Sequence, residues 1–216
     1  MSADDRAPLS RERILTAAIA VADADGIAAL SMRRLGGELG VEAMSLYNHV
    51  TNKDALLDGL VEHVIEEMDL PRPGDDWDEA ILRRAASARD VFRRHPWAMG
   101  LLEQRSANSS PNRLAYYDAV LGSMLEAGFD IEAAVRAFSI VDAYIFGFIL
   151  QELALPFDDA DSLDEVGTDL LEQMAEAFPH LTEATRHAME NGWDYAIEFR
   201  FGLDLIIDGI RRLRDG

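Results

Sequence analysis

Apolar residues recur at the spacing of amphipathic helices along almost the whole chain, and no stretch alternates apolar and polar residues as a half-buried strand does. The first helix is expected to begin after Ser10, because serine accepts hydrogen bonds from the first free amides of a helix. It is expected to end at Gly26, a residue type that often closes helices. Between them, the apolar positions at helical spacing are Ile14, Ala17, Ala18 and Val21.

The pattern continues with short elements. A second helix is expected to be capped by Ser31 and to close at Gly40. A third is predicted over residues 43–49, and a fourth over residues 53–69 with Asn52 as its cap. The first third of the chain is therefore predicted to consist of short helices separated by tight turns.

The clearest break is the segment DLPRPGDDW, residues 69–77, which holds two prolines and a glycine. We interpret it as a turn between helices rather than a flexible tether. Beyond it, the periodicity predicts helices over residues 77–94, 96–104, 111–127, 131–154, 163–178 and 182–213. The fold class is therefore predicted to be all-α.

The composition excludes several classes of site. The 216 residues suffice for one large domain or for a small domain joined to a larger one, and 49% of them are apolar, which is ample for a core. Cysteine is absent, which excludes disulfides, thiolate metal sites and a cysteine nucleophile. The N-terminal sequence lacks the apolar core of a signal peptide, and no uninterrupted apolar run reaches membrane-spanning length. We expect a cytoplasmic protein with no membrane partner.

The net charge of −20 argues at first against nucleic acid, because phosphate binding is driven by lysine and arginine. Residues 1–63 carry a net charge of −4 and residues 64–216 a net charge of −16. Any DNA contact must therefore come from a small local patch. The only lysine of the chain, Lys53, lies in the less acidic segment. Such a protein should bind random sequence weakly and depend on the fit at one site.

Three short helices with glycine turns, the third polar on one side, are typical of a helix-turn-helix unit. Residues 30–60, LSMRRLGGELGVEAMSLYNHVTNKDALLDGL, resemble the DNA-binding module of the TetR family of bacterial repressors. The G-V turn, L-Y-x-H and the following N-K-x-x-L-L carry this resemblance. Residues 199–210, FRFGLDLIIDGI, are similar to the last helix of the tetracycline repressors. The resemblance implies a helix-turn-helix domain over residues 8–54 and a helical effector-binding and dimerisation domain over residues 55–216.

The resemblance also implies the DNA contacts. Base edges are expected to meet the start of the third helix, and the phosphates the residues after it. The expected contacts are Ala43, Met44 and Ser45 for bases, Tyr47, His49 and Lys53 for phosphates, and Arg33 for one further base. Ala43 and Met44 are suited to thymine methyl groups, and Ser45 to a base edge or a phosphate. The alternative is that Tyr47 packs in the core and His49 is an incidental surface residue.

Two departures from the family pattern affect these expectations. Gly36 and Gly37 lie inside the second helix, where the family usually has alanine at the first position, and each glycine costs about 0.5–1 kcal/mol relative to alanine. Ala43 replaces the longer polar residue with which tetracycline repressors contact bases. The operator sequence therefore cannot be transferred from them.

An enzyme is the alternative class. A helical, glutamate-rich chain suits a di-iron site built on Glu-x-x-His pairs. The residues three positions before the five histidines are Leu46, Leu60, Phe92, Ala177 and Ala184, so the motif is absent. A glycine-rich phosphate loop and a G-x-S-x-G elbow are absent too. The sequence therefore predicts no catalysis, no cofactor and no metal.

The segment 131–154 is apolar all round, which predicts burial on both sides, yet Asp142 lies in its middle. A buried carboxylate needs a partner. Either Asp142 belongs to an internal ion pair with an arginine, or a turn of the helix phase lets it reach water, or it lines a ligand cavity. The resemblance implies such a cavity, for a small effector, with the lining residues Arg84, Tyr117, Val120, Val135, Phe138 and Asp142; Met99 and Leu102 lie nearby by our own interpretation.

Tetracycline repressors hold a magnesium–drug chelate with a histidine, an asparagine and a second histidine. The corresponding positions here are approximately Asp69, Arg84 and Leu102, so the resemblance implies that this metal chemistry is missing. The expected effector is therefore a largely apolar small molecule other than magnesium–tetracycline.

Near the C-terminus, an apolar stripe at four-residue spacing is formed by Trp193, Ile197, Phe201 and Leu205, and further apolar residues lie on other faces. The resemblance implies that this helix and the segment 131–154 form a four-helix dimer interface. The alternative is a core helix buried within one chain. The sequence as a whole predicts a homodimeric repressor that binds a palindromic duplex operator and is released by its effector. The alternative function is that of an activator or architectural DNA-binding protein without a ligand.

Overall fold

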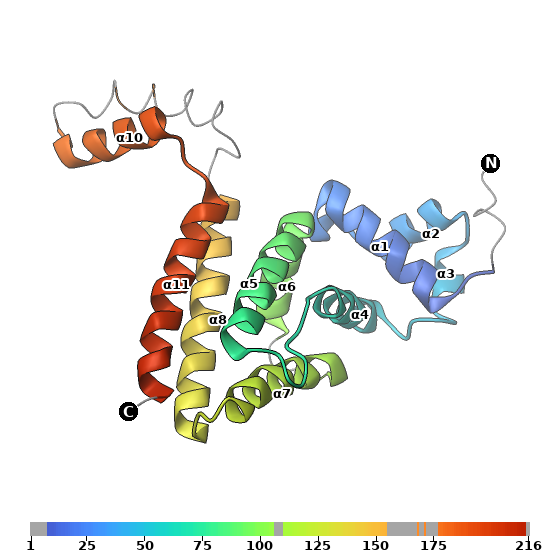
Figure 1. The fold of residues 1–216 in the computed structure, drawn as a ribbon. Coiled ribbons are helices and arrows are strands. Elements are labelled where there is room, and N and C mark those ends of the chain that lie inside the picture. Colours follow the sequence, from blue (N-terminus) through green and yellow to red (C-terminus); the bar gives the residue numbers. More distant parts are fainter. Residues whose placement is uncertain (1–7, 106–109, 155–167, 169–170, 172–176, 215–216) are drawn as a thin grey trace. The chain divides into compact units, whose positions relative to one another are not determined.

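In the computed structural model, the described residues are 8–105, 110–154, 168, 171 and 177–214, and among them the regular elements are all helices (Figure 1). The all-α prediction is confirmed. The first elements are α1 (Arg11–Asp25), the 3-10 turn η2 (Ile27–Ala29), α2 (Met32–Leu39), α3 (Ala43–Leu46) and α4 (Lys53–Glu66). The later ones are α5 (Trp77–Arg94), α6 (Pro96–Gln104), α7 (Pro111–Glu126), α8 (Ile131–Ala154), α10 (Pro179–Asn191) and α11 (Tyr195–Arg214).

The helix starts follow the predicted caps. Ser10 Oγ accepts from the Arg13 amide at 3.2 Å, and Asn52 Oδ1 accepts from the Ala55 amide at 2.8 Å. Ser31 caps α2 in the same way. At the end of α2, Gly40 adopts a left-handed conformation with φ of 68°, which favours glycine.

Some helix boundaries differ from the prediction. The predicted third helix is helical only as far as Leu46, and α4 ends at Glu66. The single helix predicted over residues 182–213 is wrong, because α10 and α11 are separated at Gly192. Gly192 has φ of 76°, a backbone conformation that residues with a side chain rarely adopt. Asp194 then accepts a hydrogen bond from the Ala196 amide at the start of α11. Most of the helix predicted over residues 163–178 lies outside the described residues.

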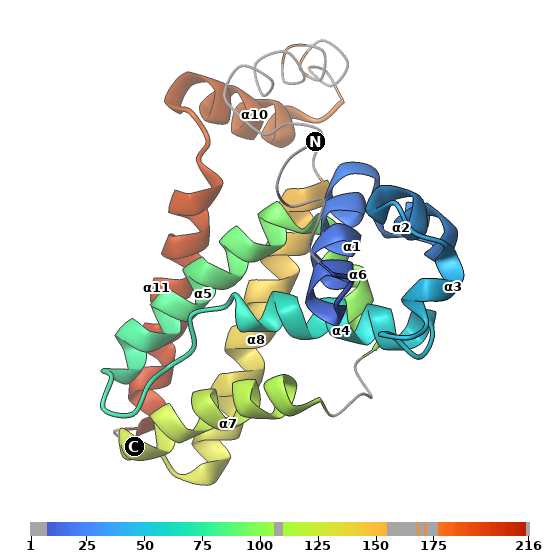
Figure 2. The same ribbon diagram turned by 90° about the vertical axis from the view of Figure 1, so that its right-hand side faces the viewer.

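The chain divides into two compact units, Met1–Ser139 and Ile140–Gly216. In the first, α2 packs against α3 and α1, and α4 contacts α1, α6 and α7 (Figure 2). Its core consists of fully buried apolar side chains from these helices and from α5, among them Ile14, Leu35, Leu46, Leu56, Leu60, Ile81, Phe92 and Met124. Helix α4 thus touches both the α1–α3 segment and the later helices of the unit.

In the second unit, α11 runs antiparallel to α8 (Figure 1). Tyr144 stacks on Phe199, with ring centroids 5.7 Å apart and an interplanar angle of 15°. Its hydroxyl donates to the Phe199 carbonyl at 3.1 Å. At Gly202 a Cβ atom would overlap the Tyr144 hydroxyl oxygen, so the two helices approach closely because this residue lacks a side chain.

By length and composition alone, α8 is apolar enough to cross a membrane. The sequence-based expectation missed this because Glu132, Arg136 and Asp142 interrupt the apolar run. The predicted burial of α8 on all sides is also wrong for the single chain, since Ile140 and Leu150 are 49% and 59% exposed. The apolar character of α8 therefore exceeds what the chain itself covers.

Candidate DNA-binding and effector sites

The turn between α2 and α3 is held by backbone contacts. The Val41 amide donates to the Gly36 carbonyl at 2.9 Å. A Cβ on Gly36 would lie 2.8 Å from the Val41 carbonyl oxygen and 3.1 Å from the Ala43 nitrogen. Gly36 therefore permits the close approach of α3 to α2, which offsets its cost within the helix. Gly37 has no neighbour within 4 Å of the corresponding position, and nothing in the structure explains it.

The segment after this turn has one buried and one exposed side. Leu46 and Val50 are buried, whereas Met44 is 75% and Tyr47 42% exposed. His49 and Lys53 are exposed as well. Tyr47 is therefore not packed in the core. Ala43 and Ser45, the other predicted base contacts, are half-buried at the start of α3.

The two arginines of α2 differ in their contacts. Arg34 forms an ion pair with Asp25 and lies 3.8 Å from Glu38, so its charge is engaged within the chain. Arg33 is exposed, and neither it nor Lys53 forms an ion pair with any residue that the structure describes. These two cations are thus available to an external anion.

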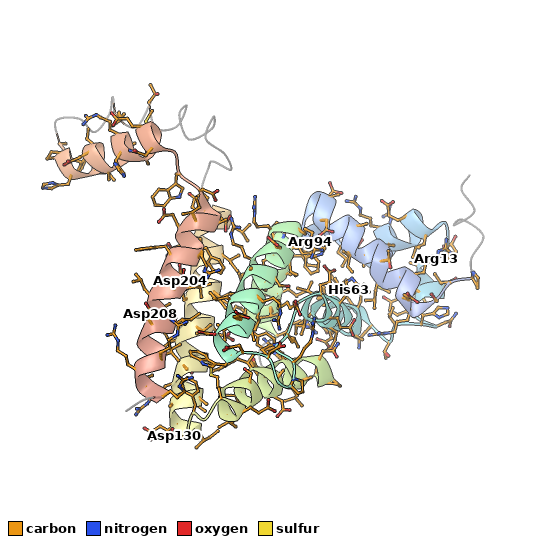
Figure 3. The ribbon with its side chains drawn as sticks, viewed as in Figure 1. Arg13, His63, Arg94, Asp130, Asp204 and Asp208 are labelled. Carbon is orange, nitrogen blue, oxygen red and sulfur yellow. The ribbon has the colours of Figure 1, made fainter. Side chains whose placement is uncertain are left out.

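Two carboxylates fasten α1 and α4 to the junction of α5 and α6. Asp23, near the end of α1, accepts from Trp97 Nε1 at 2.6 Å and lies 2.7 Å from His95 Nδ1. Glu67, directly after α4, forms an ion pair with Arg94, which Figure 3 labels. The ends of both helices are therefore fixed by charged side chains.

The predicted effector residues fall into groups. Buried in the first unit are Arg84, Met99, Leu102 and Val120. Tyr117 and Val135 are exposed at the surface of the same unit, and Phe138 is half-buried. Asp142 belongs to the second unit and is half-buried, so its burial within one chain is partial. The role of these residues in ligand binding stays a prediction.

An aromatic cluster joins several residues of the first unit. Arg84 is fully buried and donates from Nη1 to the Tyr116 hydroxyl, and its guanidinium carbon lies 5.3 Å from the Tyr116 ring centroid. Tyr117 contacts Tyr116 and Phe138 edge-on, with centroid distances of 5.6 Å in both cases. Sequence reasoning missed Tyr116, although its place beside Tyr117 in an amphipathic helix gave a weak signal.

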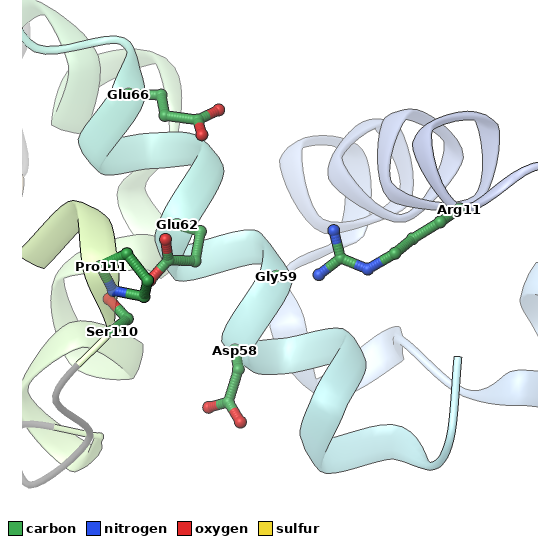
Figure 4. A pocket seen from close by; sticks show the side chains of 7 residues that line it. All are labelled: Arg11, Asp58, Gly59, Glu62, Glu66, Ser110 and Pro111. Carbon is green, nitrogen blue, oxygen red and sulfur yellow. The ribbon is translucent and has the colours of Figure 1, made fainter. Parts of the chain in front are cut away.

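Two open grooves lie on the first unit. One, of about 470 Å³, is lined by Leu114, Ala115, Tyr117, Asp118 and Leu121, and so includes one predicted effector residue. The other, of about 530 Å³, is lined by Arg11, Asp58, Gly59, Glu62, Glu66, Ser110 and Pro111 (Figure 4). It includes none of the predicted effector residues. Among the residues described, His, Asp and Glu form no group suited to holding a metal ion.

Helix α11 carries apolar residues on two faces. Phe199, Leu203, Ile207 and Ile210 are buried. Three members of the predicted stripe, Ile197, Phe201 and Leu205, lie on another face of α11 and are between 60% and 64% exposed. The fourth, Trp193, is 42% exposed but precedes the helix, because the predicted helix is interrupted at Gly192. The described part of the chain therefore leaves this stripe uncovered, in contrast to a helix buried within one chain.

Two family models match the chain. The model of bacterial regulatory proteins of the tetR family matches residues 14–60, and that of the tetracyclin repressor-like C-terminal domain matches residues 70–214. Together they include both the α2–α3 turn and the α8–α11 pair.

Individual proteins agree with these models. An HTH-type transcriptional regulator of Saccharopolyspora erythraea is 30% identical over 203 residues, which are 94% of this chain and 84% of the relative. The class C tetracycline repressor of Escherichia coli is 32% identical over 212 residues, covering 95% and 92% of the two chains. The solved structure of the Streptomyces coelicolor TetR family protein ActR in complex with actinorhodin is 29% identical, with a TM-score of 0.73 and coverage of 95% and 98%.

Proposed function

Because the chain belongs to the TetR family of bacterial transcriptional regulators, we propose that it is a repressor that binds a palindromic DNA operator as a homodimer and is released by a small effector. The observation that carries this proposal is that residues 43–53, which we name the recognition segment, have one buried and one exposed side. Leu46 and Val50 anchor it in the core, while Met44, Tyr47 and Lys53 stay exposed beside the α2–α3 turn. We also place the protein in the cytoplasm, with its DNA.

The exposed residues suit distinct parts of a duplex. Ala43 and Met44 offer apolar atoms to thymine methyl groups, and Ser45 and Arg33 offer donors to base edges. Tyr47, His49 and Lys53 follow along the chain, where donors to phosphates fix the orientation of the helix on DNA. With an overall charge of −20, the protein has little general attraction to DNA, so affinity must come from these few contacts.

The exposed apolar residues of the second unit support dimerisation. The α11 stripe and the exposed side of α8 are large apolar surfaces, which are costly in water and typical of interfaces. Packing α8 and α11 of two copies together would cover both, and would account for the hydropathy of α8 without a membrane. A homodimer presents two recognition segments, which suits half-sites roughly 34–36 Å apart.

The effector is proposed to bind at the aromatic cluster. Tyr116, Tyr117 and Phe138 offer ring faces and edges, and Arg84 gives a buried charge for orienting a largely apolar molecule. A magnesium chelate is not expected, because Asp69 lies where the resemblance puts a histidine ligand and forms ion pairs with Arg72 at 2.8 Å and Arg83 at 3.0 Å. A related structure, that of ActR, holds actinorhodin, which supports an organic ligand.

The proposal is tested in two stages. First, the purified protein selects binding sites from a random duplex library, and a palindromic site bound by a dimer is expected. Second, a compound library is screened by thermal shift, and hits are added to the protein–DNA complex to measure release. Failure to enrich any sequence contradicts the repressor proposal. Selection of a site that no stabilising compound releases supports the activator or architectural alternative.

A further inference from the structure

We propose that Met44 is a site of reversible oxidation, and that conversion of its thioether to the sulfoxide by a peroxide weakens binding to the operator. The proposal rests on the proposed function, because Met44 is one of its base contacts. It adds a chemical modification of the DNA-contacting surface to the control by an effector. Since the chain has no cysteine, its methionines carry all of its side-chain sulfur.

Met44 differs from the other described methionines in its exposure to solvent. It is 75% exposed, more than any other large apolar side chain that the structure describes. Met189, in α10, is half-buried. Four further methionines are at most 9% exposed, namely Met32, Met68, Met99 and Met124. Because an oxidant must reach the sulfur atom, Met44 is expected to react before these residues.

The backbone on both sides of Met44 is fixed. The Val41 amide donates to the Gly36 carbonyl at 2.9 Å, and a Cβ on Gly36 would lie 3.1 Å from the Ala43 nitrogen. On the other side, Leu46 is fully buried. Met44 lies between these two anchors, so its side chain stays on the exposed side of the recognition segment. A change in its chemistry is therefore presented to DNA and is not relieved by a shift of the backbone.

The reaction balances with hydrogen peroxide as the oxidant. A lone pair of the Met44 sulfur attacks one peroxide oxygen, and the S–O bond forms as the O–O bond breaks. The hydroxide that leaves takes the proton of the new S–OH group and becomes water. Sulfur is thus oxidised by two electrons and the peroxide is reduced. A thiol-dependent sulfoxide reductase reverses the change, since two thiols become a disulfide and the sulfoxide oxygen leaves as water.

The sulfoxide changes what Met44 offers to a base pair. The thioether is apolar and suits a thymine methyl group, whereas the sulfoxide oxygen is a polar acceptor that would lose its water against that methyl group. With a net charge of −20, the protein has little general attraction to DNA that could offset the loss. Affinity is expected to fall about tenfold for each oxidised half-site contact. Bound DNA covers Met44, so the reaction takes place on the free protein and opposes rebinding.

The order of oxidation is measured first, on the full-length protein without DNA. Hydrogen peroxide is added, and mass spectrometry follows each methionine-containing peptide over time. Met44 is expected to react roughly tenfold faster than Met32 or Met124. An excess of an operator selected by the untreated protein should slow Met44 by about tenfold and leave Met189 unchanged. If Met44 reacts no faster than Met124, the proposal is overturned.

Operator affinity is measured next, before and after peroxide treatment. The oxidised wild-type protein should bind about tenfold more weakly or worse, and methionine sulfoxide reductases with a dithiol should restore binding. Met44→Leu removes the sulfur, so treatment should leave the affinity of this variant at its own untreated value. Met189→Leu is the matched control and should remain as sensitive to peroxide as the wild type. Met44→Gln places a carbonyl oxygen on a chain of similar length, and should weaken binding without any oxidant.

Two results would refute the role of Met44 in DNA binding. One is unchanged operator affinity in wild-type protein whose Met44 is fully oxidised. The other is a loss of affinity on treatment that is as large in Met44→Leu as in the wild type. A wild-type protein that selects no operator refutes the proposed function instead, and the order of oxidation then still decides whether Met44 is the reactive methionine.

Discussion

The α2–α3 and α8–α11 pairs of helices each meet at a glycine, and the two glycines face different kinds of atom. In α2–α3, a Cβ on Gly36 would strike the Val41 backbone carbonyl; in α8–α11, a Cβ on Gly202 would strike the Tyr144 hydroxyl. The Val41 carbonyl moves only with the backbone of the turn, whereas a tyrosine side chain changes rotamer. The geometry of the DNA-binding pair is thus set by backbone contact, and that of the α8–α11 pair by one side chain.

The outer faces of the two pairs differ as well. The α2–α3 pair leaves Arg33 and the residues around Lys53 exposed, which suits a charged polymer. The α8–α11 pair leaves apolar stripes exposed, which suit a second copy of the same surface. The first pair therefore exposes polar and charged groups suited to DNA, while the second exposes apolar groups suited to the proposed dimer interface.

The largest effect is expected from charge on the α11 stripe. Phe201→Glu or Ile197→Glu would bury an unpaired carboxylate in the proposed interface and split the dimer. Operator affinity should then fall on the order of 100-fold or more, because the two half-sites would no longer be bound together. Sedimentation and a gel shift measure the two effects.

Arg200→Glu on the same helix is the matched control, because Arg200 is exposed and is not a member of the stripe. It should leave the dimer intact. If a folded Phe201→Glu protein still sediments as a dimer, the interface lies elsewhere.

The second effect concerns Gly202. Gly202→Ala should cost about 1–3 kcal/mol of unfolding free energy, since the new methyl group overlaps the Tyr144 side chain. Gly209→Ala is the control on the same helix. No atom lies within 4 Å of its would-be Cβ, so alanine there should stabilise by about 0.5–1 kcal/mol. Urea unfolding measures the unfolding free energy of both variants. Equal changes in the two would mean that the close approach at Tyr144 is not tight in solution.

The third effect distinguishes the proposed roles of Lys53 and Arg33 in DNA binding. Lys53→Ala should weaken binding to all sequences similarly, by about tenfold, and lower the salt slope by about one. Arg33→Ala should in addition relax discrimination at one base pair of each half-site, by about 1–3 kcal/mol. Affinities for the operator and for single-base variants at several salt concentrations test this. Full sequence preference in the Arg33 variant would remove Arg33 from base readout.

The features that the sequence predicted are local ones. Ser10, Ser31 and Asn52 cap helices because the acceptor and the amide that it binds lie three residues apart. Gly40 closes α2 because its own backbone takes a left-handed conformation. Gly192 was missed because the apolar pattern on its two sides keeps nearly the same phase, and a glycine is tolerated within a helix at modest cost.

The features that the sequence did not predict depend on distant partners. Arg84 bonds to Tyr116 across 32 positions, and Arg105 bonds to Asp58 across 47. No periodicity of one segment reveals such a pair. The burial expected for all sides of α8 is not reached within one chain for a related reason. Its apolar residues exceed what one chain covers, and a pattern of apolar positions does not tell an intramolecular neighbour from a second copy.

The smallest effect is a loss of stability at alkaline pH that depends on Tyr144 of the α8–α11 pair. Burial, and then the nearby Glu198 carboxylate, raise the pKa of Tyr144 above its ordinary value of 10.0. The neutral hydroxyl is thus favoured in the folded state, and its contribution to stability is fully present below pH 10 and is lost as pH rises through the folded pKa. Tyr144→Phe should remove this dependence along with a hydrogen bond worth about 1 kcal/mol. Urea unfolding of both proteins between pH 8 and 11 should therefore show wild type and variant converging as pH rises. Parallel curves would mean that Tyr144 ionises equally in the folded and unfolded chains, and that the α8–α11 pair does not shield it.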